Sequence, residues 1–255
     1  MKIAISGKGG VGKTTIMALL ADQLREEGKE VLLIDADPSP HMAQTLGFAP
    51  GDTIRPIAEM TDLLVERSGK TPGSPFYQIN PRIDDLMQRF MVERYGIKLM
   101  VLGAIQVAGG GCACPENTVL RRLLTKLLLT SSQVVLLDME AGIEHLGRGT
   151  IAGVDRLLIV VIPTRSSIRT ALKIKELAIQ AGIPGISFVA NLVKDAADRE
   201  FLRQGLDEEP AAFFPASVEI RQAERDERPL SLATARVGDA PRQLLERIFR
   251  ESEKG

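Results

Sequence analysis

Short apolar runs alternate along the chain with longer segments whose apolar residues recur at helical spacing. The runs are continuous rather than alternating with polar residues, which predicts strands that are covered on both faces, as in a parallel sheet between helices. The strand-like runs are 2–6 (KIAIS), 31–36 (VLLIDA), 99–103 (LMVLG), 134–139 (VVLLDM), 156–162 (RLLIVVI) and 186–191 (ISFVAN). The helical segments are 14–27, 117–130, 166–181 and 241–251. This order predicts an α/β fold, a doubly wound and mostly parallel sheet with helices on both faces.

One stretch departs from this alternation. In residues 50–98, glycine, proline and charged residues interrupt two helical pieces, most clearly in GKTPGSP at 69–75. We interpret 50–98 as an irregular insertion and expect residues 1–255 to form a single domain.

Composition and charge give no reason to expect binding to nucleic acid or to a membrane. The chain has a formal net charge of -1, which gives no general electrostatic reason to expect binding to nucleic acid. No uncharged apolar run reaches the roughly 18 residues that span a bilayer, and MKIAISG at the start reads as a strand rather than a signal peptide. The apolar stripe of segment 241–249 is typical of a helix that docks on the core, not on a membrane. We therefore expect a cytoplasmic protein.

The strongest chemical motif follows the first predicted strand. Residues 7–14, GKGGVGKT, match the G-x-x-x-x-G-K-T phosphate-binding loop in its strand, loop and helix context. Lys13 is expected to reach the β and γ phosphates, and the Thr14 hydroxyl to bind Mg²⁺. The alternative is a glycine-rich turn that only joins a strand to a helix. The nucleotide-binding residues predicted here are Gly9, Gly10, Val11, Gly12, Lys13, Thr14 and Thr15.

Carboxylates follow two further predicted strands. Asp138 ends the fourth run, where we expect it to hold the magnesium shell, and Gly142 follows with a backbone that can face a γ phosphate. Asp35 and Asp37 follow the second run, and Asp35 fits a helix cap equally well. A guanine-reading N-K-x-D motif is missing, because positions 192 and 194 hold Leu192 and Lys194, so ATP is favoured.

Several segments resemble a known family. GKGGVGKTT, with Lys8 after the first glycine, resembles the deviant Walker A loop of the MinD and nitrogenase iron protein class of dimeric ATPases. The segments 35–47 (DADPSPHMAQTLG), 109–117 (GGGCACPEN) and 138–150 (DMEAGIEHLGRGT) resemble the CooC-type nickel-insertion ATPases that mature carbon monoxide dehydrogenase, and their acetyl-CoA synthase relatives.

The resemblance implies roles for individual residues. Lys8 would reach across a two-fold axis to the partner's nucleotide, Asp37 would orient or activate water, and Asn191 would read adenine. Pro215 stands where the family places a proline loop against the base, whereas Leu192 replaces the basic residue that usually follows the asparagine. The implied partners are a second copy of the chain and a nickel enzyme, either carbon monoxide dehydrogenase or acetyl-CoA synthase.

Both cysteines of the chain, Cys112 and Cys114, lie in segment 109–117, one of those that carry this resemblance. In an extended segment, residues i and i+2 point to one side, and Pro115 suits the first position of a helix whose N-terminal field favours thiolate at Cys114. One chain supplies only two ligands, but a two-fold dimer supplies four, which suits tetrahedral Zn²⁺ or square-planar Ni²⁺. A buried apolar pair and a redox pair remain alternatives. His41 and His145 have no ligand spacing to the cysteines, and we expect neither to bind metal.

Three functions from different classes follow. The first is an ATP-hydrolysing dimeric metallochaperone that uses ATP, Mg²⁺ and Ni²⁺ or Zn²⁺. The second is an iron-sulfur carrier or reductase like the nitrogenase iron protein, in which the four cysteines of the dimer hold a cluster. The third is a positioning ATPase like MinD or ParA, which would use neither cysteine.

Overall fold

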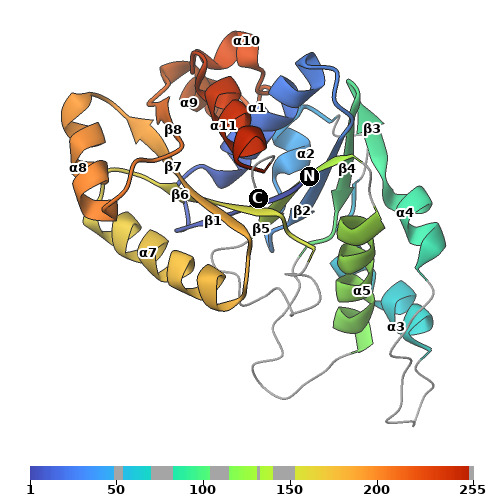
Figure 1. Ribbon diagram of the computed structural model, residues 1–255. Coiled ribbons are helices and arrows are strands. Elements are labelled where there is room, and N and C mark those ends of the chain that lie inside the picture. Colours follow the sequence, from blue (N-terminus) through green and yellow to red (C-terminus); the bar gives the residue numbers. More distant parts are fainter. Residues whose placement is uncertain (49–53, 70–82, 104–114, 131–132, 140–152, 253–255) are drawn as a thin grey trace.

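The sheet has the predicted doubly wound architecture. The computed structural model describes residues 1–48, 54–69, 83–103, 115–130, 133–139 and 153–252. In these residues the strand order is β3-β4-β2-β5-β1-β6-β7-β8 (Figure 1), and every pair is parallel except β3 with β4. The strands are β1 (Lys2–Gly7), β2 (Val31–Ala36), β3 (Val92–Arg94), β4 (Ile97–Val101), β5 (Val134–Met139), β6 (Arg156–Val161), β7 (Gly185–Val193) and β8 (Ala212–Pro215).

Helices cover both faces of this sheet (Figure 1). The N-terminal half holds α1 (Lys13–Glu26), α2 (Met42–Thr45), the 3-10 turn η1 (Ile57–Glu59), α3 (Thr61–Ser68), α4 (Asp84–Phe90) and α5 (Pro115–Thr130). The C-terminal half holds α7 (Arg165–Gln180), α8 (Ala196–Leu206), α9 (Val218–Arg225), α10 (Leu232–Ala235) and α11 (Ala240–Ser252). Helix α5 begins at Pro115, the residue that the sequence predicts for this position.

Successive strand residues supply two separate apolar cores. In β1, Ile3 and Ile5 join the core under α1 and α11, whereas Ala4 joins the core under α5 and α7. Leu244 and Ile248 of α11 are fully buried in the first of these cores. The prediction that the C-terminal helix docks on the core is therefore confirmed.

Strand β4 begins and ends two residues earlier than the sequence predicts. The apolar run at 99–103 predicts a strand there, but β4 spans Ile97–Val101. The backbone N–H groups of Leu102 and Gly103 both donate to the carbonyl of Asp35, at 2.8 and 3.2 Å, and Gly103 has φ 74°. The chain therefore turns one residue after β4, although its apolar run continues.

The stretch interpreted as an insertion contains regular structure in its described part. It holds η1, α3, α4, β3 and the first residues of β4, and α3 packs against α5. Its status as an insertion within one domain stays a prediction. Within the described ranges, no helix combines the length and the apolar character needed to cross a bilayer.

Candidate nucleotide-binding site

The glycine-rich loop joins β1 to α1 at the carboxyl edge of the sheet. At Gly7 a Cβ atom would lie 2.6 Å from the carbonyl oxygen of Val160 on β6, so the loop passes too close to the sheet for any side chain there. Gly12 adopts φ 88° and precedes the first turn of α1. These constraints leave the backbone N–H groups after Gly12 at a helix N-terminus, where an anion is stabilised.

An open cavity of about 560 Å³ lies against this loop. Three parts of the chain form its walls, namely the loop with the start of α1, the segment after β2, and the end of α9 with the residues that follow. The lining residues are Gly9, Gly10, Gly12, Lys13, Thr14, Thr15, Asp37, Ser39, His41, Gln44, Thr45, Ala223, Glu224, Glu227, Arg228 and Leu230. The structure therefore brings most of the predicted loop residues together with Asp37 around one cavity.

A buried carboxylate lies beneath the cavity. The Thr14 hydroxyl donates to Oδ2 of Asp138 at 2.5 Å, and Oδ1 of Asp138 is buried without a hydrogen-bond partner among the described residues. Asp35 lies beside it in register on β2, and its carboxylate accepts the backbone N–H groups of Asp37 and Met42. Asp35 therefore binds the backbone of the segment after β2, although the N-cap position of α2 is His41. Burial raises the pKa of Asp138 to about 7, the Thr14 hydrogen bond opposes this rise and the charge of Asp35 adds to it.

The pKa of Asp138 makes the stability of the free protein depend on pH. An aspartate in the unfolded chain titrates near 3.9, so between about pH 4 and pH 7 the folded protein holds a proton that the unfolded chain has lost. The free energy of unfolding therefore falls as pH rises through this window, by on the order of 4 kcal/mol for this group, and levels off above it. We expect urea midpoints measured in EDTA without nucleotide to be lower at pH 8 than at pH 5. Asp138→Asn should reduce this difference, and the part that remains is expected from Asp35, whose pKa burial also raises. An equal pH dependence in both proteins would contradict the assignment.

The segment after β2 places two further side chains at the cavity. Asp37 lines the cavity, and its Oδ1 accepts the backbone N–H of Ser39 at 2.8 Å. His41 lines the same cavity, and its Nδ1 contacts the carbonyl of Ser39. Over the part of the chain that is described, no group of three or more histidine, cysteine, aspartate or glutamate side chains could hold a metal ion.

Lys8 lies exposed on the outer side of the loop. Its Nζ donates to the hydroxyl of Ser166, in the first turn of α7, at 2.9 Å. Lys8 does not line the cavity of its own chain. The Lys8 side chain thus contacts α7 and not the cavity.

Asn191 and Pro215, the residues predicted to contact the base, do not line the cavity, and of the two Asn191 contacts the loop. The Asn191 amide is buried and donates to the carbonyl of Val11 at 2.8 Å. Leu192, the next residue, has φ 55° at an irregularity in the pairing of β7 with β8, and β8 ends at Pro215. Neither residue is among those that line the cavity, so their contact with adenine stays a prediction.

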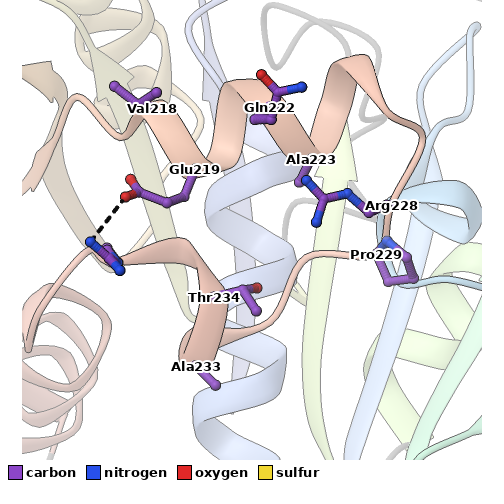
Figure 2. A pocket seen from close by; sticks show the side chains of 9 residues that line it. Val218, Glu219, Gln222, Ala223, Arg228, Pro229, Ala233 and Thr234 are labelled. Atoms are coloured by element: carbon purple, nitrogen blue, oxygen red, sulfur yellow. Dashed lines mark ion pairs between the residues drawn. The ribbon is translucent and has the colours of Figure 1, made fainter.

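Helix α9 supplies a wall of the cavity that the sequence patterns do not predict. Its Glu224 accepts a hydrogen bond from the Thr15 hydroxyl at 3.2 Å. Ala223 and Arg228 also line a second cavity of about 650 Å³ between α9 and α10, where Glu219 pairs with Arg236 (Figure 2). The only sequence signal for this wall is the Ser217 cap, whose hydroxyl accepts the N–H of Ile220.

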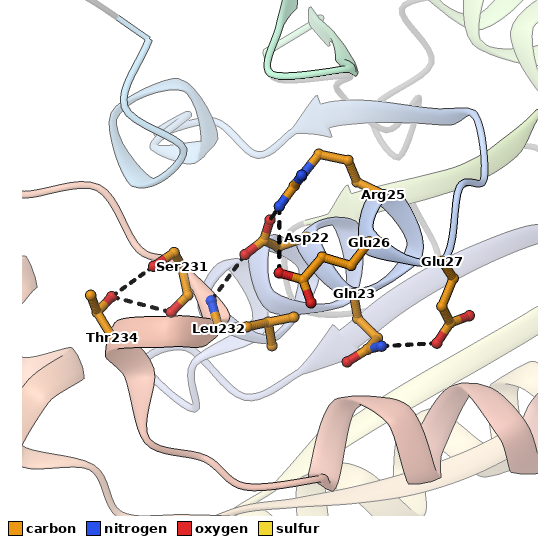
Figure 3. Close-up of polar contacts among 8 residues, drawn as sticks. All are labelled: Asp22, Gln23, Arg25, Glu26, Glu27, Ser231, Leu232 and Thr234. Carbon is orange, nitrogen blue, oxygen red and sulfur yellow. Dashed lines mark hydrogen bonds and ion pairs between the residues drawn. The ribbon is translucent and has the colours of Figure 1, made fainter.

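The helix that follows the loop also holds this wall in place. Asp22 of α1 is buried, and its carboxylate accepts the N–H of Leu232 at 2.9 Å and a hydrogen bond from Arg25 (Figure 3). Leu232 is the first residue of α10, and the two residues that follow it, Ala233 and Thr234, line the second cavity. Asp22 thus links α1 to the start of α10.

The predicted thiol site lies outside the described residues. Cys112 and Cys114 belong to this part of the chain, as do Gly142 and His145.

The chain belongs to the CobQ/CobB/MinD/ParA nucleotide-binding domain family, whose sequence profile matches residues 2–230. Within curated proteins, it is 45% identical to the carbon monoxide dehydrogenase accessory protein CooC of Rhodospirillum rubrum, over 82% of this chain and 80% of that protein. It is also 41% identical to an uncharacterized ATP-binding protein of Methanocaldococcus jannaschii, over 91% of both chains. The predicted resemblance to the CooC branch of this class is confirmed.

Solved structures confirm the fold. The MinD cell division protein of Aquifex aeolicus, in its complex with MinC, superposes with a TM-score of 0.70 at 22% identity, over 98% of this chain and 96% of that chain. MinD of Pyrococcus horikoshii, in its complex with Mg-ADP, superposes with a TM-score of 0.68 at 20% identity. Together with the family, the relatives identify the chain as an ATP-binding enzyme that hydrolyses ATP.

Proposed function

We propose that the chain is a dimeric metallochaperone that uses ATP hydrolysis to assist nickel insertion into carbon monoxide dehydrogenase or acetyl-CoA synthase. Its support is the combination of a C-x-C pair, Cys112 and Cys114, with 45% identity to a carbon monoxide dehydrogenase accessory protein over most of the chain. Nickel, or zinc in its place, is the cargo. Two protomers would each contribute two thiolates to it.

The cavity beside the glycine-rich loop would hold ATP. Lys13 would contact the β and γ phosphates, and Thr15 would adjoin the α phosphate at the start of the helix. Glu224 accepts a hydrogen bond from Thr15 and lines the same cavity, where its carboxylate would accept the ribose hydroxyls. The base would extend from there toward Asn191 and Pro215.

Thr14 and Asp138 fit a bound magnesium ion. The Thr14 hydroxyl would be a direct ligand, and Oδ1 of Asp138, which has no partner among the described residues, would accept a hydrogen bond from a metal-bound water. The bound ion neutralises charge that develops on the β and γ phosphates. Asp37, whose side chain faces the same cavity, would orient or activate the attacking water.

Dimer closure would couple ATP to the metal. Lys8 is an exposed residue of the loop, and in a closed dimer it would exchange its contact with Ser166 for one with the partner's nucleotide. ATP can drive metal transfer only if the open and closed dimers differ in metal affinity. The thiolates would therefore gain or lose nickel as the interface rearranges, and hydrolysis would reset the dimer.

Metal content after gel filtration tests the proposal. The wild-type protein, loaded with Ni²⁺ or Zn²⁺, should retain up to about one ion per dimer, and the amount should differ between ATP and ADP. Cys112→Ala/Cys114→Ala should retain almost none in either nucleotide, because a site of four thiolates loses every ligand. The cysteine variant should still hydrolyse ATP. As a matched control, Asp37→Asn should lose hydrolysis but keep the metal. If the cysteine variant retained as much nickel and as much zinc as the wild-type protein, the thiol site would be ruled out.

A further inference from the structure

A groove of about 430 Å³ runs between α7 and α8, at the end of the sheet away from α3 and α5 (Figure 1). It combines an apolar floor and rim with two arginines at one margin. Its lining residues are Arg165, Ile168, Arg169, Leu172, Phe201, Gln204 and Gly205.

A glycine in α8 creates the floor of this groove. At Gly205 a Cβ atom would lie 2.6 Å from Cδ1 of Ile168, so the absence of a side chain lets Ile168 pack on the backbone of α8. Ile168 is consequently buried, while Leu172 and Phe201 on the two facing helices remain 40% and 37% exposed. Two large apolar side chains thus border a groove whose floor is already apolar.

The two arginines beside the groove carry unpaired charge. Arg165 and Arg169 are exposed, stand one turn apart on α7, and form no ion pair or hydrogen bond with any residue that the structure describes. The neighbouring cations are engaged, since Lys173 pairs with Glu176 and Lys175 with Glu208. The groove margin is therefore the part of α7 that offers positive charge to a partner.

We infer that this groove docks an amphipathic helix of another protein, with apolar residues along one face and carboxylates beside them. Apolar side chains at helical spacing would contact Leu172 and Phe201, and carboxylates would pair with Arg165 and Arg169. A second copy is a poorer occupant, because a two-fold contact across this margin sets arginine against arginine. Ser166, the acceptor of the Lys8 hydrogen bond, follows Arg165, so the groove begins next to the nucleotide loop.

Binding of two labelled helical peptides to the full-length protein tests this inference. Both peptides carry leucines at positions i, i+3, i+4 and i+7, and they differ only in having glutamates or lysines at the flanking positions. The glutamate peptide should bind in fluorescence anisotropy, and the lysine peptide should bind at least about tenfold more weakly. Arg165→Glu/Arg169→Glu should weaken the glutamate peptide about tenfold, and so should Leu172→Ala/Phe201→Ala. The control Arg221→Glu/Arg250→Glu makes the same charge change at exposed arginines of α9 and α11 and should leave binding unchanged.

Three results would overturn the inference. One is equal binding of the two peptides, and another is equal loss of binding in the control variant. The third concerns self-association: if Leu172→Ala/Phe201→Ala converts an ATP-dependent dimer to monomers in light scattering, the groove is an interface between copies of the chain. Retained ATPase activity in every variant would show that loss of peptide binding does not reflect unfolding.

Discussion

Asp138→Asn should abolish most ATP hydrolysis and yet stabilise the free protein at pH 8. The carboxylate is buried beside Thr14 and Asp35, and its raised pKa means that ionisation costs folding free energy in the free protein. An amide of the same shape avoids this cost and can still accept the Thr14 hydrogen bond. The same charge is needed once magnesium and ATP are bound, so we expect kcat to fall by about 10²–10³-fold.

The measurement is kcat together with the thermal midpoint at pH 8, in EDTA and again in Mg-ATP. A gain of a few kcal/mol should raise the midpoint in EDTA by several degrees for a chain of this length. In Mg-ATP the wild-type protein should gain stability, and the variant should gain much less. Asp62→Asn, an exposed aspartate on α3, is the control and should change neither quantity. A destabilised variant at pH 8, or one with normal kcat, would contradict the assigned role.

How much of the site was predictable depends on how local each signal is. The motif at 7–14, which includes Lys13 and Thr14, stands between a predicted strand and a predicted helix. The sequence alone therefore places these residues at one edge of the sheet. Asp138 is distant in sequence, but it ends a continuous apolar run, and parallel strands bring such ends together. These residues could therefore be predicted without coordinates.

The α9 wall could not be predicted in this way. Glu224 lies 209 positions from its partner Thr15, and α9 is a short helix with only Ala223 buried, so no local pattern in the sequence links this helix to the glycine-rich loop. The raised pKa of Asp138 is likewise a consequence of tertiary packing, because it arises from burial and from Asp35 on a neighbouring strand. The end of β4 also depends on tertiary contacts. The chain leaves the strand where Leu102 and Gly103 donate to the carbonyl of Asp35, although its apolar run continues.

Mixing two inactive variants should restore ATP hydrolysis if Lys8 acts on the partner's nucleotide. Lys8→Ala alone should lower kcat by about 10²–10³-fold, because the site loses a cation that stabilises phosphate charge. An equal mixture with Asp138→Asn forms mixed dimers in which the intact site of the Lys8→Ala protomer receives Lys8 from its partner. Half of the dimers are then mixed and each has one complete site, so activity should recover to about a quarter of wild type.

The competing explanation is that Lys8 matters only through Ser166 of its own chain, to which it donates a 2.9 Å hydrogen bond. In that case Ser166→Ala should lose as much activity as Lys8→Ala, and the mixture should stay inactive, because no partner can replace a contact within one protomer. If Lys8 acts across the dimer, Ser166→Ala should retain most activity. The substitution then removes only the hydrogen bond from Lys8 to Ser166, which is already broken when the dimer closes. Recovery must also depend on dimer concentration, because the completed site exists only while the two protomers are joined.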